Sequence, residues 1–141
     1  MTIKQISVFL ENKPGALRKM IDTLADKNIN LRSLTLVESQ DFGLARIITD
    51  DPYNTSTVLR EEGYVTSIVP VFAVEMPDEP GGLTNVLGVL SDNDININYL
   101  YAFTGSKKNA AYVVLRIEEI EKAKSVFISN GIKPLCSEEL L

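Results

Sequence analysis

The 141-residue chain contains no histidine and no tryptophan, and it has a single cysteine. Without histidine it lacks the commonest zinc ligand, the usual general base near neutral pH, and every Ser-His or Cys-His nucleophile pair. Cys136 has no partner for an internal disulfide, which fits a reducing compartment, and we interpret it as a small apolar residue near the end of the last strand. These absences argue against a metal site and common forms of nucleophilic catalysis, and no cofactor is indicated.

The chain also lacks a long apolar run and an excess of positive charge. No apolar stretch approaches the roughly 18 residues needed to span a bilayer. The start has no basic region followed by an apolar block, so we expect a cytoplasmic protein rather than an exported one. A net charge of −5 argues against a large contact with a phosphate backbone. We therefore expect neither a membrane nor a nucleic-acid partner.

The sequence does contain an internal repeat. Residues 11–17, Glu-Asn-Lys-Pro-Gly-Ala-Leu, return as residues 77–83, Pro-Asp-Glu-Pro-Gly-Gly-Leu, 66 positions later. The same offset relates Val8 to Val74, Leu17 to Leu83, Leu24 to Leu90, Ile29 to Ile95, Asn30 to Asn96 and Leu34 to Leu100. Such a repeat indicates a duplicated structural unit. We predict two small domains, 1–70 and 71–141, which at roughly 70 residues each should share an interface or dimerise.

The first repeat carries the hydrophobic patterns of four strands and two helices. Alternating or continuous apolar residues predict strands at 3–10, 30–39, 44–49 and 64–69. Apolar residues at helical spacing predict a helix from Ala16 to about Asn28, and a second that is capped by Asp50 or Asp51 and ends at Gly63. The order is strand, helix, strand, strand, helix, strand.

The second repeat predicts the same six elements, at 71–76, 83–90, 97–104, 110–117, 119–130 and 132–136. Gly131 lies 68 positions after Gly63, so two extra residues precede it, and we place them in the turn 105–109. Only Pro70 separates the repeats, where it removes one amide donor and bends the path from one strand into the next. We expect an α+β fold of two ferredoxin-like units packed side by side, each with two helices on one face of a four-stranded antiparallel sheet.

The Pro-Gly turn precedes a helix in both repeats, and it has two interpretations. One is a turn and nothing more, since Asn or Asp, Pro and Gly are typical turn residues. The other is an anion site, because unpaired amides and the helix dipole attract a carboxylate, and glycine lets a ligand approach the backbone. Asn12 or Asp78 at the rim would then accept an ammonium group. Together these features describe a site for a free α-amino acid.

These motifs resemble those of the ACT domain family. They comprise an apolar strand, an Asn/Asp-x-Pro-Gly turn, a helix beginning at leucine, and a following Asn-Ile-Asn or Asp-Ile-Asn, in the same order twice. The whole chain looks like a stand-alone tandem pair of such domains. The resemblance implies a non-catalytic regulatory module that binds a free amino acid in a groove where two units sit with their second strands adjacent. A free-standing pair must pass its signal to another chain or buffer its ligand, so we expect a homodimer and a regulated enzyme in trans.

The resemblance also implies which residues contact the ligand. They are, in the two turns, Asn12, Pro14, Gly15, Ala16 and Leu17, with Asp78, Pro80, Gly81, Gly82 and Leu83, and on the edge strands Asn30, Leu31 and Arg32, with Asn96, Ile97 and Asn98. Some members carry a histidine two positions before the turn's Asn, where this chain has Leu10 or Met76, which argues against a serine-type site.

The two turns differ in charge, so we expect unequal sites. Asp78 and Glu79 are both acidic and lie next to two glycines, so the ligand's ammonium group should favour the second turn. Three alternating aromatic residues at 99, 101 and 103 lie on one face of the second edge strand. They either receive a ligand side chain or pack against another unit or chain. Arg32 either pairs with a ligand carboxylate or is solvated.

Two other classes of function are alternatives to amino-acid binding. One is a structural or dimerising protein with empty pockets, whose exposed edge strands pair with a second copy. The other is an enzyme: acylphosphatase chemistry on this fold needs an arginine in the turn before the first helix, and neither repeat has one. That turn also lacks the paired cysteines of metal carriers. RNA binding would need rings and basic residues on the middle strands, whereas residues 44–48 contain one arginine and no ring.

Overall fold

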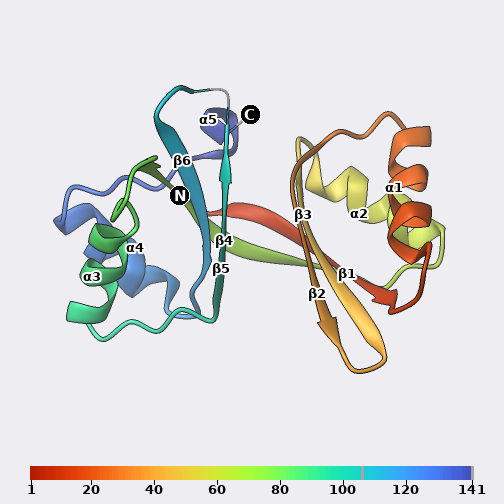
Figure 1. Ribbon diagram of the computed structural model, residues 1–141, viewed down its shortest axis with the longest axis horizontal. Helices are drawn as coiled ribbons and strands as arrows, with labels where there is room; N and C mark the ends of the chain where they lie inside the picture. Colours follow the sequence, from red (N-terminus) through yellow and green to blue (C-terminus); the bar gives the residue numbers. More distant parts are fainter. Residues whose placement is uncertain (106, 141) are drawn as a thin grey trace. The chain divides into compact units, whose positions relative to one another are not determined.

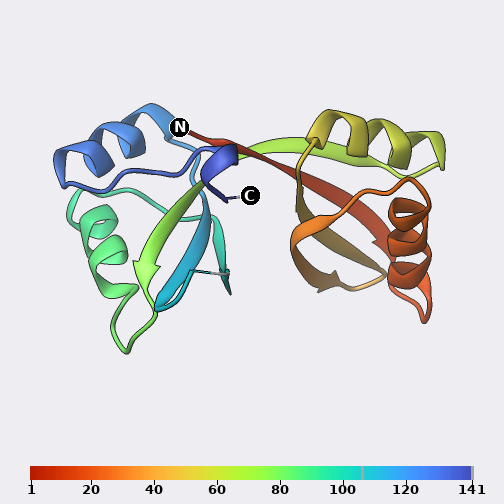
Figure 2. The same cartoon turned by 90° about the horizontal axis from the view of Figure 1, so that it is seen from above.

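The computed structural model describes residues 1–105 and 107–140, and the chain forms two compact units (Figures 1 and 2). The first unit is Lys4–Val69, and the second is Pro70–Leu140 together with Met1–Ile3. No helix in the described ranges is long and apolar enough to cross a membrane. The two units are described in turn.

The first unit contains two helices and a sheet. Its elements are β1 Ile3–Glu11, α1 Ala16–Asp26, β2 Leu31–Ser39, β3 Phe42–Thr49, α2 Pro52–Glu61 and the beginning of β4 Thr66–Pro77. The strand order is β2-β3-β1-β4, and β3 pairs antiparallel with both β1 and β2. Figure 1 shows α1 and α2 on the same face of this sheet. The predicted ferredoxin-like pattern is confirmed here.

The core of the first unit lies between that face and the two helices. Alternate β1 residues point into it, as the period-2 pattern predicted. Its buried members are Ile6, Val8, Leu10, Met20, Leu24, Ala45, Ile47 and Leu59. Because β1, β3, α1 and α2 all contribute, burial of this core holds together the β1–α1 connection, which contains the Pro-Gly turn.

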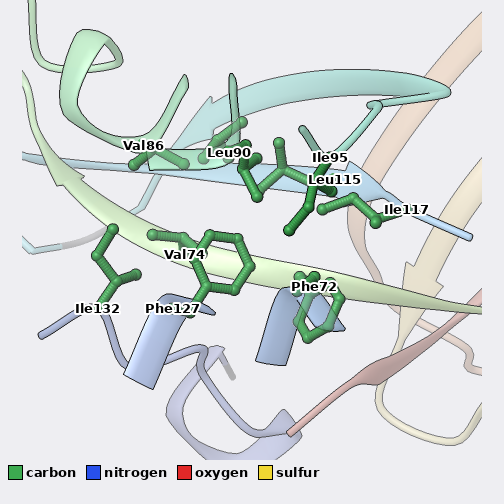
Figure 3. Packing of buried hydrophobic residues seen from close by; sticks show 11 residues of the cluster. Phe72, Val74, Val86, Leu90, Ile95, Leu115, Ile117, Phe127 and Ile132 are labelled. Carbon is green, nitrogen blue, oxygen red and sulfur yellow. The ribbon is translucent and has the colours of Figure 1, made fainter. Parts of the chain in front are cut away.

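The second unit repeats the arrangement with the rest of β4. Its further elements are α3 Thr84–Asp92, β5 Tyr99–Thr104, β6 Ala110–Arg116, α4 Ile120–Ser129 and the short α5 Ser137–Leu140. The strand order is β4-β6-β5, antiparallel throughout. Figure 3 shows its core, where the rings of Phe72 and Phe127 meet edge to face at a centroid distance of 5.4 Å. Both rings are fully buried, so they anchor α4 on β4.

Local signals at the helix ends are confirmed. Asp51 precedes α2, and its carboxylate accepts a hydrogen bond from the Asn54 amide at 3.1 Å, so it caps the helix. Asn28, with φ 57°, follows α1 in the left-handed conformation. Gly63 and Gly131 do the same after α2 and α4.

The last predicted strand, residues 132–136, is wrong. The segment runs alongside β4 but forms no strand, and α5 begins directly after it. One backbone hydrogen bond to β4 is found for this segment in the described structure, from the Leu135 amide to the Ala73 carbonyl at 2.7 Å. The Leu135 amide is directed at β4, so an amide at position 134 would be directed away from it, and Pro134 removes no donor from a ladder with β4.

Two strands that Pro70 was expected to separate form one continuous strand. β4 runs from Thr66 to Pro77 and passes through Pro70. The fixed φ of proline is compatible with extended backbone, so Pro70 removes one amide donor without ending the strand. The two repeats therefore share a single strand.

Strand register confirms where the two extra residues of the second repeat lie. Leu36 pairs with Ala45 in the first unit, and Ala102 pairs with Val113 in the second. The first members of these pairs are 66 positions apart and the second members 68, so the insertion falls in the β5–β6 hairpin. Ser106, within the predicted turn 105–109, lies outside the described residues.

Candidate ligand-binding site

The turn of the first unit is an open corner between β1 and α1. Gly15 has φ 85°, a left-handed conformation that favours glycine, and a Cβ added there would meet no atom within 4 Å. The Lys13 carbonyl accepts from the Ala16 amide at 3.3 Å, which closes the turn. The Gly15 surface is therefore unobstructed within this unit, and a ligand can approach the backbone there.

Helix α1 begins at this corner without a side-chain cap. The Gly15 carbonyl accepts from the Lys19 amide at 3.0 Å, but no hydrogen bond to the amides of Leu17 and Arg18 is found within residues 1–105 and 107–140. Unpaired amides at a helix start carry partial positive charge and favour an anion. The corner thus has the donors that a ligand carboxylate needs.

The turn of the second unit is built differently. Gly81 repeats the left-handed conformation with φ 80°, but a Cβ on Gly82 would clash with the carbonyl oxygen of Pro77. Helix α3 starts only at Thr84, two residues later than α1 relative to the repeat. The second glycine, which we expected to make room for a ligand, instead allows the turn to fold against its own backbone.

Charge distinguishes the two turns as the sequence predicted. In the first turn, Lys13 forms an ion pair with Glu11 at 2.8 Å, and its hydrogen bond lowers the pKa of the Glu11 carboxyl group. In the second turn, Asp78 and Glu79 are exposed, and the part of the chain that the structure describes offers them no ion pair. The second turn therefore presents uncompensated negative charge to an ammonium group.

A hollow opens beside each turn. In the second unit a hollow of about 620 Å³ lies between the turn, the start of α3 and residues 131–135, and we call it the Lys133 hollow. It is lined by Val74, Glu75, Met76, Pro77, Glu79, Gly81, Gly82, Asn85, Val86, Gly131, Ile132, Lys133 and Leu135. The corresponding hollow of the first unit measures about 290 Å³. Sequence reasoning missed this feature, because the apolar pattern at 132–136 predicted a strand beside β4.

A smaller hollow of the first unit joins several of the predicted residues. It measures about 80 Å³ and lies between the turn and the far end of β2. Asn12, Ala16 and Leu17 line it from the turn, and Leu36 and Glu38 line it from β2. The turn residues are therefore brought together as expected, but beside the end of β2 rather than its start.

The predicted strand-start residues lie at the opposite end of the sheet from the turn of their own unit. Leu31 pairs with Thr49, whereas Glu11, next to the turn, pairs with Phe42 at the other end of β3. Asn30 is exposed just before β2. The first unit therefore does not bring its predicted turn and strand-start residues together.

The second unit repeats this separation. Asn96 is exposed, and Ile97 packs partly buried against the core. The Asn98 amide donates to the Arg116 carbonyl at 2.9 Å, and the Asn98 side chain lies 3.4 Å from the Glu118 carboxylate. Asn98 is thus engaged at the start of β5, away from the Gly81 turn.

Arg32 is exposed to solvent, and it is already paired with a carboxylate of its own unit. Its guanidinium forms two hydrogen bonds with the Asp50 carboxylate, at 2.7 and 3.2 Å. This pairing raises the pKa of Arg32 and lowers that of Asp50. The partner lies 18 residues away, beyond the reach of local sequence reasoning.

The aromatic residues of β5 share one face, as predicted. Tyr99, Tyr101 and Phe103 are partly buried, whereas Leu100, between them, pairs with the core residue Leu115 and so lies on the helix-bearing face. The Phe103 ring lies 5.5 Å from that of Tyr112 on β6. Phe103 is therefore already packed within its own unit.

Similarity to known proteins identifies the family. The chain is similar to a protein of known structure from Bacteroides thetaiotaomicron, with 36% identity over 99% of this chain and 96% of that one and a TM-score of 0.92. It is also similar in fold to regulatory subunits of aspartate kinase from Thermus thermophilus and Thermus flavus, each with 15% identity over 89% of this chain and a TM-score of 0.62, covering 91% and 90% of those chains.

A comparison with curated proteins found no match. The family model described as an ACT domain pair matches residues 1–141, the full length of the chain. Together with the two ferredoxin-like units, each of which contains a Pro-Gly turn, this match shows that the chain belongs to the ACT domain family, as an ACT domain pair.

Proposed function

We propose that this ACT domain pair is a non-catalytic regulatory module that binds a free α-amino acid at its Pro-Gly turns. The observation that carries the proposal is the open Gly15 corner, where α1 starts with uncapped amides beside an unobstructed backbone. Such a corner stabilises a carboxylate without a reactive group. Membership of the family supports the same function.

The two turns are proposed to bind unequally. Amide donors for a ligand carboxylate are available at each helix start, but only the second turn adds two exposed carboxylates that can accept from an ammonium group, those of Asp78 and Glu79. The ammonium group of a zwitterion gains more from a charged acceptor than from the Asn12 side chain. The proposed contacts remain, in the turns, Asn12, Pro14, Gly15, Ala16 and Leu17, with Asp78, Pro80, Gly81, Gly82 and Leu83, and at the strand starts Asn30, Leu31, Asn96, Ile97 and Asn98.

A regulatory module without chemistry needs a recipient for its signal. One structural relative carries the name of a regulatory subunit of aspartate kinase. By analogy, we propose that this chain acts in the cytoplasm on a separate enzyme and is itself a homodimer. Co-purification with a tagged copy of the chain, with and without amino acids, would identify such an enzyme.

Calorimetric titration with the twenty amino acids tests the proposal. Protein at a concentration suited to millimolar affinity should release or absorb heat with at least one of them. The matched variant is Gly15→Val, which puts a branched side chain on the open corner, and its control is Gly88→Val, in α3 and away from both turns. Heat with none of the twenty amino acids would reject amino-acid binding.

A purely structural role is the second candidate, because β2 exposes apolar side chains. Leu34 and Leu36 are 40% and 51% exposed on β2. This strand lies at the edge of the sheet, where β3 is its neighbour. Edge strands of this kind associate with other chains. If the function is dimerisation alone, Leu36→Lys should convert a dimer to a monomer in light scattering, and no amino acid should alter the dimer.

A further inference from the structure

The second unit leaves part of the β4 edge without a strand partner. The Ala73 carbonyl accepts from Leu135, so it points away from β6. Backbone groups alternate along a strand, so those of Glu75, two residues on, point the same way. The counterpart of Glu75 in the first unit is Phe9, whose amide donates to the Val65 carbonyl at 3.0 Å. Within the described residues, the Glu75 amide has no such bond.

The gap arises where the last strand fails to form. Lys133 takes the place of Val65 in the repeat, but no backbone hydrogen bond joins it to Glu75 within the described residues. The Lys133 hollow opens beside Glu75, at about 620 Å³ against about 290 Å³ in the first unit. A hollow of this size is within the range of small-molecule sites.

The geometry of an antiparallel pair defines what fits this edge. Two residues in a hydrogen-bonded pair exchange two bonds, one from each amide to the other's carbonyl. A free α-amino acid carries both partners on one carbon: its carboxylate accepts from the Glu75 amide, and its ammonium group donates to the Glu75 carbonyl. We propose that the Lys133 hollow binds a free α-amino acid paired with the main chain of Glu75, in the place of the missing strand residue.

The lining of the hollow supports this assignment and indicates the ligand's side chain. Lys133 is well exposed at the rim, where its ammonium group forms a long ion pair with Glu139 at 3.8 Å, and it attracts the ligand's carboxylate. Glu79 supplies the opposite charge. Apolar Met76, Val86 and Ile132 also line the hollow, and the last two belong to the edge of the core seen in Figure 3. The preferred ligand therefore has an aliphatic side chain.

The Glu75 side chain does not compete for the ligand. Its carboxylate forms an ion pair with Lys107 at 2.6 Å. That contact raises the pKa of Lys107. Because the Glu75 carboxylate is occupied by Lys107, the main chain of Glu75 is the group that recognises the ligand. Recognition by the main chain makes both charged ends of the amino acid necessary. The inference rests on the proposed function and places its second site.

Nuclear magnetic resonance titration of the full chain with leucine tests the pairing directly. The Glu75 amide should shift strongly and become protected from exchange, whereas the Phe9 amide, already bonded to Val65, should change in neither respect. Shifts confined to Leu83 and the first amides of α3, with Glu75 unchanged, would overturn the inference while leaving the proposed function intact. Absence of any shift with every amino acid would overturn both.

Ligand analogues and a blocking variant provide the second test. Leucine should bind at least tenfold more tightly than 4-methylpentanoate, which lacks the ammonium group, or 3-methylbutylamine, which lacks the carboxylate, because each loses a charge-assisted bond. Asn85→Phe, at the wall of the hollow, should abolish binding, and Ser91→Phe, exposed at the other end of α3, should preserve it. Circular dichroism verifies that both variants fold. Unchanged leucine affinity in Asn85→Phe would exclude the hollow as the site.

Lys133→Met separates charge attraction from pairing. It should weaken leucine binding severalfold and make the remaining affinity less sensitive to salt, because the exposed ammonium acts through a screened attraction. Lys122→Met, which removes an exposed lysine on α4, is the matched control and should leave both properties unchanged. Equal behaviour of the two variants would show that Lys133 does not face the ligand and would contradict the assignment.

Discussion

The Arg32 guanidinium and the Asp50 carboxylate form a two-bond pair that connects the start of β2 to the end of β3, with Nε to Oδ1 at 2.7 Å and Nη2 to Oδ2 at 3.2 Å. The pair spans the end of the sheet opposite the Gly15 corner. It therefore fixes the strand start that the family resemblance assigns to ligand contact.

This pair should be visible in the titration of Asp50. The hydrogen bond from Arg32 lowers the Asp50 pKa, with burial opposing it. Because the folded pKa lies below the unfolded one, the stabilisation is present above about pH 4 and is lost as the pH falls through the folded pKa. Carboxyl resonances in Arg32→Ala should show the Asp50 pKa raised towards its ordinary value. Arg18→Ala, near Asp22, should leave it unchanged.

The two turn glycines should differ in their response to alanine. Gly15→Ala forces a side chain into a left-handed conformation with open space around it, and should cost about 1 kcal/mol of unfolding free energy. Gly82→Ala should cost about 3 kcal/mol, because its Cβ overlaps the Pro77 carbonyl and the turn must shift. Urea unfolding measures both values. Equal losses would contradict the backbone contact at Gly82.

The Phe72–Phe127 contact should dominate the stability of the second unit. Phe127→Ala removes a fully buried ring and should reduce the unfolding free energy by about 4 kcal/mol. The adjacent Ile128 is 56% exposed, so Ile128→Ala should change it by less than about 0.5 kcal/mol. Thermal unfolding followed by calorimetry distinguishes the two. A comparable loss in both variants would place α4 in a different rotation on the sheet.

The charge difference between the turns should appear in ligand affinity. Asp78→Ala should weaken amino-acid binding about tenfold, and Asn12→Ala only about twofold, since an ionised acceptor makes the stronger bond to ammonium. Calorimetric titration of each variant with the amino acid that binds the unmodified chain gives the comparison. Equal losses would remove the asymmetry that we propose.

Much of the fold follows from short-range features of the sequence. The 66-residue repeat established two similar units, and the alternating and helical patterns established the order of elements. Asp51, Asn28 and Gly63 were recognised as helix ends because their effect depends on a few neighbouring residues. The Pro-Gly turns before α1 and α3 were recognised as turns for the same reason.

Other features depend on contacts between residues far apart in the chain. Three features are set by segments that meet only after folding. They are the pairing of Arg32 with Asp50, the close approach of the Pro77 carbonyl that leaves no room for a Cβ at Gly82, and the hollow beside Glu75. The missing strand at 132–136 illustrates the limit. Its apolar pattern fits a strand, but a strand exists only where it exchanges a series of backbone hydrogen bonds with a neighbour, and the described residues give this segment one such bond to β4, from Leu135 to Ala73. Local pattern determined which elements form, and long-range pairing decided where the second unit stays open.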